Sequence, residues 1–420
     1  MLYEKGKWMR LLAVLAVALM VLAACQQGTT PGGTDEEEGE VITIADGEGI
    51  KIAVLQVISG DNASLGTDQV RAIEIAVDDR GGELLNHPIE LQVEDEGCSN
   101  AGGQAAVQKV LADPQFVGIL GTSCSGAAVP ASEAMSEAGL VMISGSNTTP
   151  FLTKLGGEAG TDYHEGYFRS AHNDEIQGTA AANFAFTEQD KTKAASIHDG
   201  DPYTQGLAGV FDEAFKAAGG EITIATAVDK AQEDMRPVLT EIAASGAELI
   251  FFPIFQPAGD FIVKQAKEIP GLSDVVLMGA DGLLSDTYVV IPETEGMYFS
   301  GPATPTGPEY EEFVAKYEAK FGEKPIQSFH AHAYDATNIL LDAIEEVAEE
   351  QDDGSLQISR NRLREAVGAT SGYEGLTGSL TCDEFGDCAD AKIDVVQNTA
   401  RQTTISEVRA NVLFTYDPSS

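Results

Sequence analysis

The strongest constraint in this sequence is an alternation of apolar runs with helical patterns, which occurs twice in succession. The first series has apolar runs at residues 50–57, 88–95, 116–120 and 140–144. The second has them at residues 193–198, 221–227, 248–252 and 274–280. Near-continuous apolar runs are typical of parallel strands that are buried on both faces. The alternation therefore predicts an α/β fold with two doubly wound parallel sheets.

The two halves also predict where function lies. In open α/β sheets, ligands bind outside the carboxyl ends of the strands, and a cleft between two lobes is a usual place for a small ligand. From about Gly301 the pattern is mostly helical. We expect this remainder to pack on the two halves, because it has no complete sheet of its own.

The N-terminus has the features of an export signal. Lys5, Lys7 and Arg10 precede an unbroken apolar run that is too short to span a bilayer comfortably. The run ends in "LAAC", which resembles the bacterial lipobox, so we expect residues 1–25 to be a lipoprotein signal peptide and Cys25 to be diacylated. An ordinary cleavage site with an incidental cysteine is the alternative. The acidic, Gly- and Thr-rich residues 26–48 are expected to form a disordered tether.

The remaining cysteines suggest two disulfides, because an even number in an exported chain usually pairs. Cys382 and Cys388 flank the short turn "CDEFGDC", so we expect them to pair and to leave Cys98 with Cys124. A metal site is the rival interpretation. The four thiols lack CxxC spacing, and we expect neither a metal nor a cofactor.

Charge and motif patterns exclude several classes of function. The chain has 67 acidic and 25 basic side chains and a formal net charge of −42, which argues against nucleic acid and against a docking patch for anionic lipid. Residues 121–125, "GTSCS", lack the final glycine of a G-x-S-x-G nucleophile elbow. Only His198 lies at a strand end, and His330 and His332 do not share a helix face. We therefore do not expect an enzyme.

The turns after the strands suit the binding of a small zwitterion. Ser125 is placed to cap a helix that begins near Gly126, and free N–H groups at a helix N-terminus can bind a carboxylate. The turn Ser146-Asn147-Thr148 adds hydroxyl and backbone donors. Asp281 follows a strand of the second half, where a carboxylate can accept an ammonium group. Together these turns predict a site for an α-amino acid.

Residues 50–398 resemble the periplasmic binding proteins for leucine, isoleucine and valine, which are type I solute receptors of ABC importers. The segments that carry the resemblance occur in the family's order: "VISGDNASLGTDQVRAIEIAVDDRGG", "EDEGCSNAGGQAAVQKVL", "GTSCSGAAVPAS", "ISGSNTTP", "HDGDPYTQGLA", "MGADG" and "FVAKYEAKFGEKP". The resemblance implies the same type I fold of two lobes and a Cys98–Cys124 disulfide. The Cys382–Cys388 pair is a departure from the leucine receptors.

The resemblance also implies roles for individual residues. Ser125 and Thr148, with Ser146 alongside, would bind the ligand carboxylate and amino group. Asp281 stands where leucine receptors carry a glutamate that binds the ammonium group. The other expected ligand contacts are Tyr203 in the second lobe, Phe255 in place of a tyrosine, Leu65 in place of an aromatic residue, and Cys124 and Asn147 in the two ligand turns.

The implied architecture has a hinge of three crossings, near Arg169, Gly301 and Asp394. It gives an N-terminal lobe of residues 49–169 and 302–393 and a C-terminal lobe of residues 170–301 and 394–420. The implied function is an extracytoplasmic receptor that closes on a branched-chain or related amino acid. It would be lipid-anchored in the periplasm or at the cell surface, and its partners would be permease subunits with a separate ATPase. A sensory receptor and an importer receptor for an amide or carboxylate are the alternatives.

Overall fold

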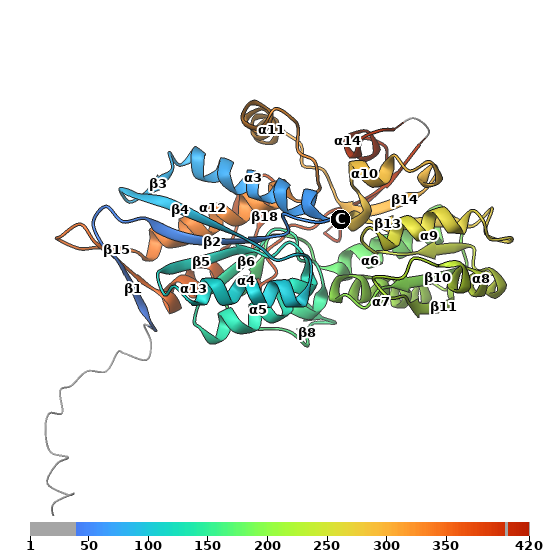
Figure 1. Cartoon of the computed structure of the whole chain (residues 1–420), viewed down its shortest axis with the longest axis horizontal. Coiled ribbons are helices and arrows are strands. Elements are labelled where there is room, and N and C mark those ends of the chain that lie inside the picture. Colours follow the sequence, from blue (N-terminus) through green and yellow to red (C-terminus); the bar gives the residue numbers. More distant parts are fainter. Residues whose placement is uncertain (1–38, 400–401, 420) are drawn as a thin grey trace, which may run out of the picture. The chain divides into compact units, whose positions relative to one another are not determined.

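The first sheet of the structure, a computed structural model that describes residues 39–399 and 402–419, follows the first apolar series (Figure 1). Its order is β3-β4-β2-β5-β6-β9, and all pairs are parallel except β3–β4. The strands are β2 (Ile50–Gln56), β3 (Glu83–Leu84), β4 (His87–Asp95), β5 (Phe116–Gly121), β6 (Val141–Ser144) and β9 (Tyr167–Arg169). The expectations for residues 1–25 lie outside the described residues.

Helices cover both faces of this sheet, which explains why β2 is apolar throughout. Ile52 and Val54 pack in one core with α3 and α12, whereas Ala53 and Leu55 pack in another with α4 and α5. The helices of this part of the molecule are α3 (Ala63–Asp79), α4 (Asn100–Leu111), α5 (Ser125–Glu137), α11 (Pro308–Phe321), α12 (His330–Val347) and α13 (Arg360–Gly368).

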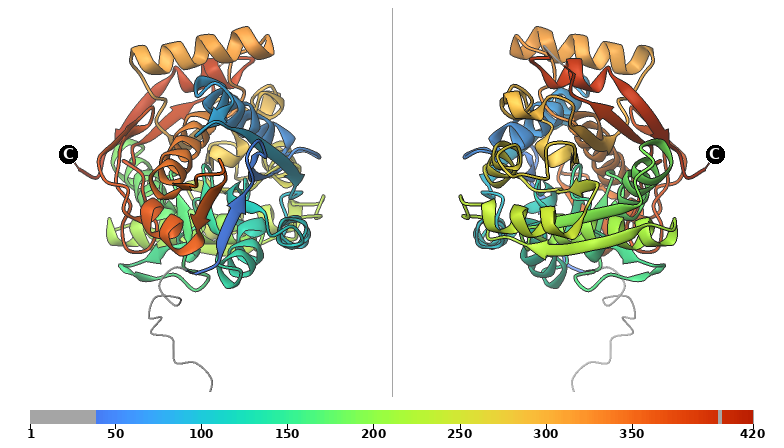
Figure 2. Two further views of the ribbon diagram at one scale, coloured as in Figure 1. Left: turned by 90° about the vertical axis from the view of Figure 1, so that its left-hand side faces the viewer. Right: turned by 90° about the vertical axis from the view of Figure 1, so that its right-hand side faces the viewer.

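The second sheet has the order β11-β10-β12-β13-β14-β19-β20 (Figure 2). At one edge, β19 runs antiparallel to both of its neighbours, β14 and β20. α6 and α7 pack on one face, and α8 and α9 pack on the other. Its strands are β10 (Lys193–His198), β11 (Glu221–Ala227), β12 (Leu249–Phe251), β13 (Val276–Ala280), β14 (Tyr298–Pro302), β19 (Ile393–Gln397) and β20 (Val412–Tyr416). Its helices are α6 (Asp174–Asn183), α7 (Pro202–Ala217), α8 (Arg236–Ser245), α9 (Ala258–Ala266), α10 (Asp286–Val289) and α14 (Ile405–Arg409).

Three small sheets complete the described strands. They consist of β1 (Val41–Ile44), β16 (Leu356–Ser359) and β15 (Glu349–Glu350), of β7 (Lys154–Leu155) and β8 (Glu158–Ala159), and of β17 (Tyr373–Gly375) and β18 (Gly378–Leu380). Short helical turns are η1 (Pro150–Leu152), η2 (Phe184–Glu188), η3 (Asp281–Leu283) and η4 (Pro292–Thr294). The two-sheet α/β architecture agrees with the sequence analysis, whereas the expected lobe boundaries stay a prediction.

The disordered tether was expected to extend to residue 48, and β1 corrects this expectation. Residues 41–44 pair antiparallel with β16, and the side chains of Ile42 and Ile44 are buried while Val41 and Thr43 are exposed. This alternation is the signature of a strand with one buried face. The folded part of the chain therefore begins before Ile50.

Both expected disulfides are present. Cys98 bonds to Cys124 and Cys382 bonds to Cys388. The first joins the turn that precedes α4 to the residue that precedes α5, so it holds two loops together at the carboxyl end of the first sheet.

We expect Ile42→Ala and Ile44→Ala each to lower the free energy of unfolding by about 2–4 kcal/mol, because each removes a buried aliphatic side chain and leaves a cavity. Thr43→Ala, on the exposed face of the same strand, is the matched control and should change stability by less than about 0.5 kcal/mol. Urea unfolding measures all three variants. Equal, negligible effects would mean that residues 41–44 belong to the tether.

Candidate functional site

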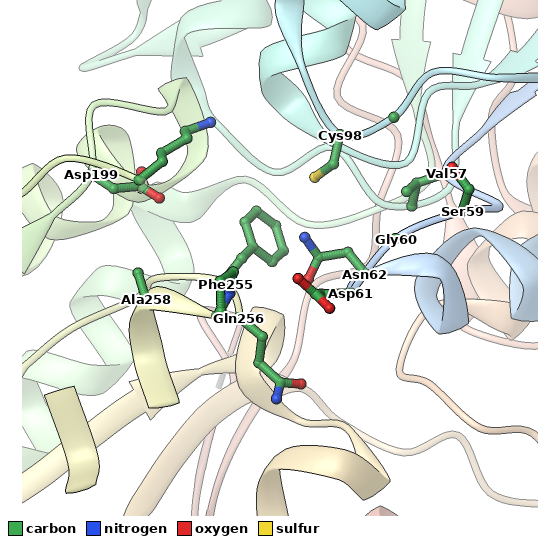
Figure 3. A pocket seen from close by; sticks show the side chains of 13 residues that line it. Val57, Ser59, Gly60, Asp61, Asn62, Cys98, Asp199, Phe255, Gln256 and Ala258 are labelled. Carbon is green, nitrogen blue, oxygen red and sulfur yellow. The ribbon is translucent and has the colours of Figure 1, made fainter. Parts of the chain in front are cut away.

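A cavity of about 250 Å³ lies between the loop after β2 and the segment before α9 (Figure 3). Its first wall consists of Val57, residues 59–62 and the Gly97-Cys98 turn, and its second includes Asp199, Lys230 and residues 255–258. A smaller adjacent cavity is lined by Leu65, Phe255 and Asp281. Three of the residues expected at the site therefore line one space between the two sheets.

Tyr203, Phe255 and Asp281 form one cluster on the second sheet's side of this space. The rings of Tyr203 and Phe255 have centroids 5.1 Å apart, and the Tyr203 hydroxyl donates a hydrogen bond of 3.3 Å to Asp281 Oδ1. The Gln177 amide donates a second hydrogen bond of 2.6 Å to the same oxygen. Burial raises the pKa of Asp281 to about 6.

Asp174 is a second buried carboxylate of this region, and the sequence analysis missed it. It is the first residue of α6, its side chain is fully buried, and neither carboxylate oxygen has a hydrogen-bond partner among the described residues. Burial raises its pKa well above the ordinary value, and the nearby charge of Asp281 raises it further. Its backbone N–H donates to the Thr148 carbonyl at 2.9 Å. Asp174 therefore links the turn of residues 146–148 to the cluster of Tyr203, Phe255 and Asp281.

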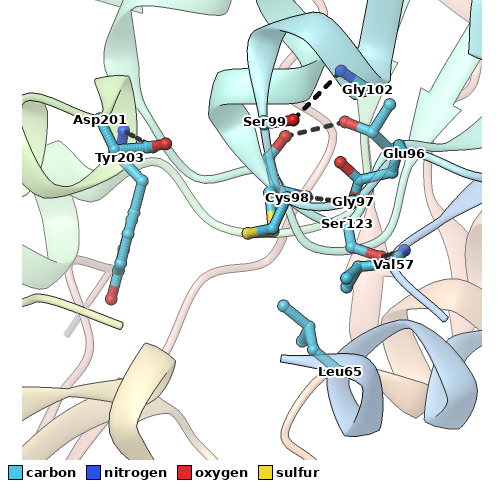
Figure 4. Close-up of a disulfide and its surroundings, with 12 residues drawn as sticks. Val57, Leu65, Glu96, Gly97, Cys98, Ser99, Gly102, Ser123, Asp201 and Tyr203 are labelled. Carbon is cyan, nitrogen blue, oxygen red and sulfur yellow. Dashed lines mark hydrogen bonds between the residues drawn. A yellow bond between two sulfur atoms is a disulfide. The ribbon is translucent and has the colours of Figure 1, made fainter. Parts of the chain in front are cut away.

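An apolar wall connects the two sides. Leu65, Cys124, Val57, Ala171 and Phe329 form one buried cluster against which Phe255 and Cys98 pack. Figure 4 shows the Cys98 disulfide above Leu65, with Tyr203 across the opening. The expected pocket residues Leu65 and Phe255 thus contact the same apolar surface.

The expected residues of the first sheet lie beside the cavities without lining them. Ser146 Oγ accepts from the Gln69 amide at 2.9 Å and donates to the Ser123 carbonyl at 2.8 Å. Asn147 Oδ1 accepts from Thr122 and Tyr167 hydroxyls, so this amide points into the first lobe. None of Ser125, Ser146, Asn147 and Thr148 lines either cavity.

Ser125 does not cap α5 as expected. The helix begins at Ser125 itself, its N-cap residue is Cys124, and that cap makes no side-chain hydrogen bond. Ser125 Oγ instead accepts a long hydrogen bond of 3.4 Å from the Thr149 N–H. Cys124 has the extended backbone that is usual for an N-cap residue, so Ser125 is the first residue of the helix and not its cap.

Two protein carboxyl groups lie at the N-terminus of α5. Glu96 Oε1 accepts a hydrogen bond of 3.3 Å from the Cys124 N–H. Asp201 lies against Gly126, the second residue of the helix, because a Cβ added at Gly126 would lie only 2.5 Å from Asp201 Oδ2. Asp201 is paired with Lys230 at 2.6 Å. Burial raises the pKa of Glu96 to about 8, so this group is mainly protonated at neutral pH. Glu96 therefore adds little negative charge at this helix N-terminus, and Lys230 offsets the charge of Asp201.

The Cys382–Cys388 loop supports residues 147–149 through a buried arginine. Arg169 is fully buried, pairs with Asp387 at 2.5 Å, and donates to the carbonyls of Asn147 and Thr149 at 3.2 and 2.8 Å. Cys388 N–H donates in turn to the Arg169 carbonyl. The additional disulfide therefore holds the loop whose Asp387 orients Arg169.

His330 and His332 line neither of these two cavities. His330 contacts Asp68 at 2.9 Å and Tyr310 at 2.9 Å inside the first lobe, and His332 is buried nearby. Within residues 39–399 and 402–419, no group of three or more His, Cys, Asp and Glu side chains is arranged to hold a metal ion.

Comparisons with known proteins identify the family. Residues 49–397 match the family described as periplasmic binding protein. The chain belongs to the periplasmic binding protein family. A Leu/Ile/Val-binding protein homolog of Brucella melitensis is 26% identical over 352 residues, covering 82% of this chain and 90% of that protein. The family consists of extracytoplasmic binding proteins, so this chain is a binding protein and not an enzyme.

Solved structures share the fold. The leucine binding protein LivK of Thermotoga maritima has a TM-score of 0.74 at 22% identity and covers 88% of this chain and 99% of its own. A solute binding protein from R. palustris in complex with benzoate has a TM-score of 0.69 at 19% identity and covers 84% and 94%. Across the part of the chain that the structure describes, no helix has both the length and the apolar character needed to cross a membrane.

We expect Glu96→Gln to raise the free energy of unfolding at pH 7.5. The native protein keeps a proton that the unfolded chain releases, because the pKa of Glu96 rises from 4.5 to about 8 on folding. The free energy of unfolding of the wild type therefore decreases as the pH rises from 4.5 to about 8. Relative to the wild type, the variant should be more stable by about 1 kcal/mol or more at pH 7.5 and equally stable near pH 4.5. Urea unfolding measures both proteins at each pH, with Glu90→Gln, at an exposed position of the preceding strand β4, as the control. A gain independent of pH would contradict the assignment.

Proposed function

We propose that this protein is the solute receptor of an ABC importer and that its ligand is a branched-chain or related amino acid held between the lobes. The main support is the pair Asp174 and Asp281, two buried carboxylates for which the structure describes no ion-pair partner. Two buried acidic groups are costly without a cation. A ligand ammonium group would supply that cation.

The other end of the ligand has a complementary environment. The N-terminus of α5 offers backbone donors, and the Thr148 turn lies next to it through the Ser125–Thr149 contact. Because Glu96 is mainly neutral at pH 7, it does not repel a ligand carboxylate there. We assign the carboxylate to Ser125, Thr148 and Ser146, and the ammonium group to Asp281 and Asp174.

The apolar wall selects the side chain of the ligand. Leu65, Phe255 and Phe329 form one apolar surface, which suits an aliphatic side chain. Relatives that bind leucine, isoleucine and valine support this ligand class. The benzoate-binding neighbour shows that the fold also accepts aromatic acids. An anion without an ammonium group would meet the Asp174–Asp281 pair, so we favour the amino acid over a simple carboxylate.

Transport follows from closure about a hinge. The proposed crossings near Arg169, Gly301 and Asp394 would let the Tyr203–Phe255–Asp281 side move against the disulfide side, and a permease with a separate ATPase would recognise the closed form. The signal peptide, the diacylated Cys25 and the lipid anchor belong to the same proposal. They rest on the "LAAC" sequence.

Calorimetric titration of the purified protein at pH 7.5 tests the ligand class. We expect saturable binding of leucine, isoleucine or valine, and no measurable binding of benzoate. Asp281→Asn and Asp174→Asn should each weaken amino acid binding at least about tenfold, because each removes a charged hydrogen-bond acceptor. For the same reason affinity should fall below pH 6, where Asp281 becomes protonated.

Glu295→Gln is the matched control, since it removes one exposed charge from the same lobe and should change affinity less than about twofold. Benzoate binding without amino acid binding would replace the proposed ligand class. Unchanged affinity in both aspartate variants would remove the acidic pair from the site.

A further inference from the structure

A groove of about 710 Å³ lies away from the proposed ligand cleft, between η1 and β7 on one side and α6, α7, β10 and β11 on the other. α7 and β11, which form part of its second wall, lie side by side in Figure 1. Phe151, Leu155 and Val210 give the groove apolar walls, and Leu155 is exposed. The groove shares no lining residue with the two cavities of the cleft.

The charge of the groove is entirely negative. Its lining includes Glu175, Asp212 and Glu213 and contains neither lysine nor arginine. His198 also lines it, and burial lowers the pKa of this imidazole, so it adds no positive charge at neutral pH. Glu175 accepts from the Gly156 N–H at 2.6 Å, and Glu213 pairs with Lys216 at 2.8 Å.

Asp212 differs from these two carboxylates because one of its oxygens has no partner. The side chain is 8% exposed, Oδ2 accepts from the Ser196 hydroxyl at 3.0 Å, and Oδ1 makes no hydrogen bond to any described residue. Lys216, the nearest basic group of its helix, is already engaged by Glu213. A buried carboxylate oxygen without a donor is costly, and a ligand N–H would satisfy it.

Gly209 supplies a second observation. It lies in the interior of α7, where glycine is unfavourable compared with alanine. A Cβ added there would meet no atom within 4 Å, whereas one added at Gly206 would lie 2.8 Å from Thr149 Oγ1. Close packing therefore explains why position 206 has no side chain, but it does not explain the glycine at position 209. The missing side chain keeps the groove open.

We propose that this groove is a second binding site, for a small organic amine whose ammonium group contacts Asp212 and whose apolar body lies against Phe151, Leu155 and Val210. The negative lining excludes organic acids, and the apolar walls distinguish such an amine from an inorganic cation. The site is independent of the amino acid proposed for the cleft.

Titration with benzylamine, followed by ligand-observed NMR, tests this site in the full chain. Benzyl alcohol and benzoate serve as neutral and anionic analogues of nearly the same shape. We expect saturable binding of benzylamine at concentrations up to about 10 mM and at least about tenfold weaker binding of both analogues, because they lack the charged donor. Equal binding of benzyl alcohol, or no saturable binding of benzylamine, would overturn the proposal.

Variants locate the bound amine. Asp212→Asn and Gly209→Leu should each weaken benzylamine binding at least about tenfold, the first by removing the charge and the second by filling the groove. Glu213→Gln removes the same charge at the exposed rim and should have less than about a twofold effect. If Asp212→Asn does not fold, the effect of Gly209→Leu on benzylamine binding tests whether the amine binds in this groove. Loss of binding in Asp281→Asn, or unchanged binding in Gly209→Leu, would place the amine elsewhere.

Discussion

The rest of the account depends on two carboxylates that are buried together and have no ion-pair partner among the described residues. Asp174 begins α6 and Asp281 follows β13, and burial raises the pKa of both. Tyr203 and Gln177 donate hydrogen bonds to Asp281, but neither side chain carries a positive charge. A region of this kind gains stability when a cation enters it, which connects the electrostatics of the second lobe to the proposed ligand.

The first lobe contributes rigidity to the proposed site. The Cys98–Cys124 disulfide holds two loops at the start of α4 and α5, and Arg169 holds the second ligand turn through two carbonyls. Asp387, from the loop closed by the additional disulfide, orients that arginine. This arrangement gives the Cys382–Cys388 pair a role in positioning the proposed site, although the pair lies far along the chain from residues 146–149.

Much of the fold could be predicted because its signals are local. Residues of β2 face two helical layers in alternation, so the whole strand must be apolar. Tyr203, Phe255 and Asp281 follow strand ends of one sheet and meet, as the rule for parallel sheets predicts. β1 was missed because only Ile42 and Ile44 mark it within an acidic segment.

Other parts of the site depend on tertiary packing. α6 was missed because its buried positions are mainly alanine, glycine and polar residues, and its local signal is Asn173 capping an acidic first turn. Asp174 was missed with it. Ser125 was expected to cap α5, but the helix begins one residue earlier and Cys124 is its N-cap. The raised pKa of Glu96 arises from burial that no sequence pattern displays.

A crystal structure of the protein grown with leucine tests the central claim most directly. The account predicts that the leucine nitrogen lies within about 3.2 Å of a carboxylate oxygen of Asp281 or Asp174, with the leucine carboxylate at the N-terminus of α5. Leucine bound in the reverse orientation, or with its nitrogen facing neither aspartate, would contradict it.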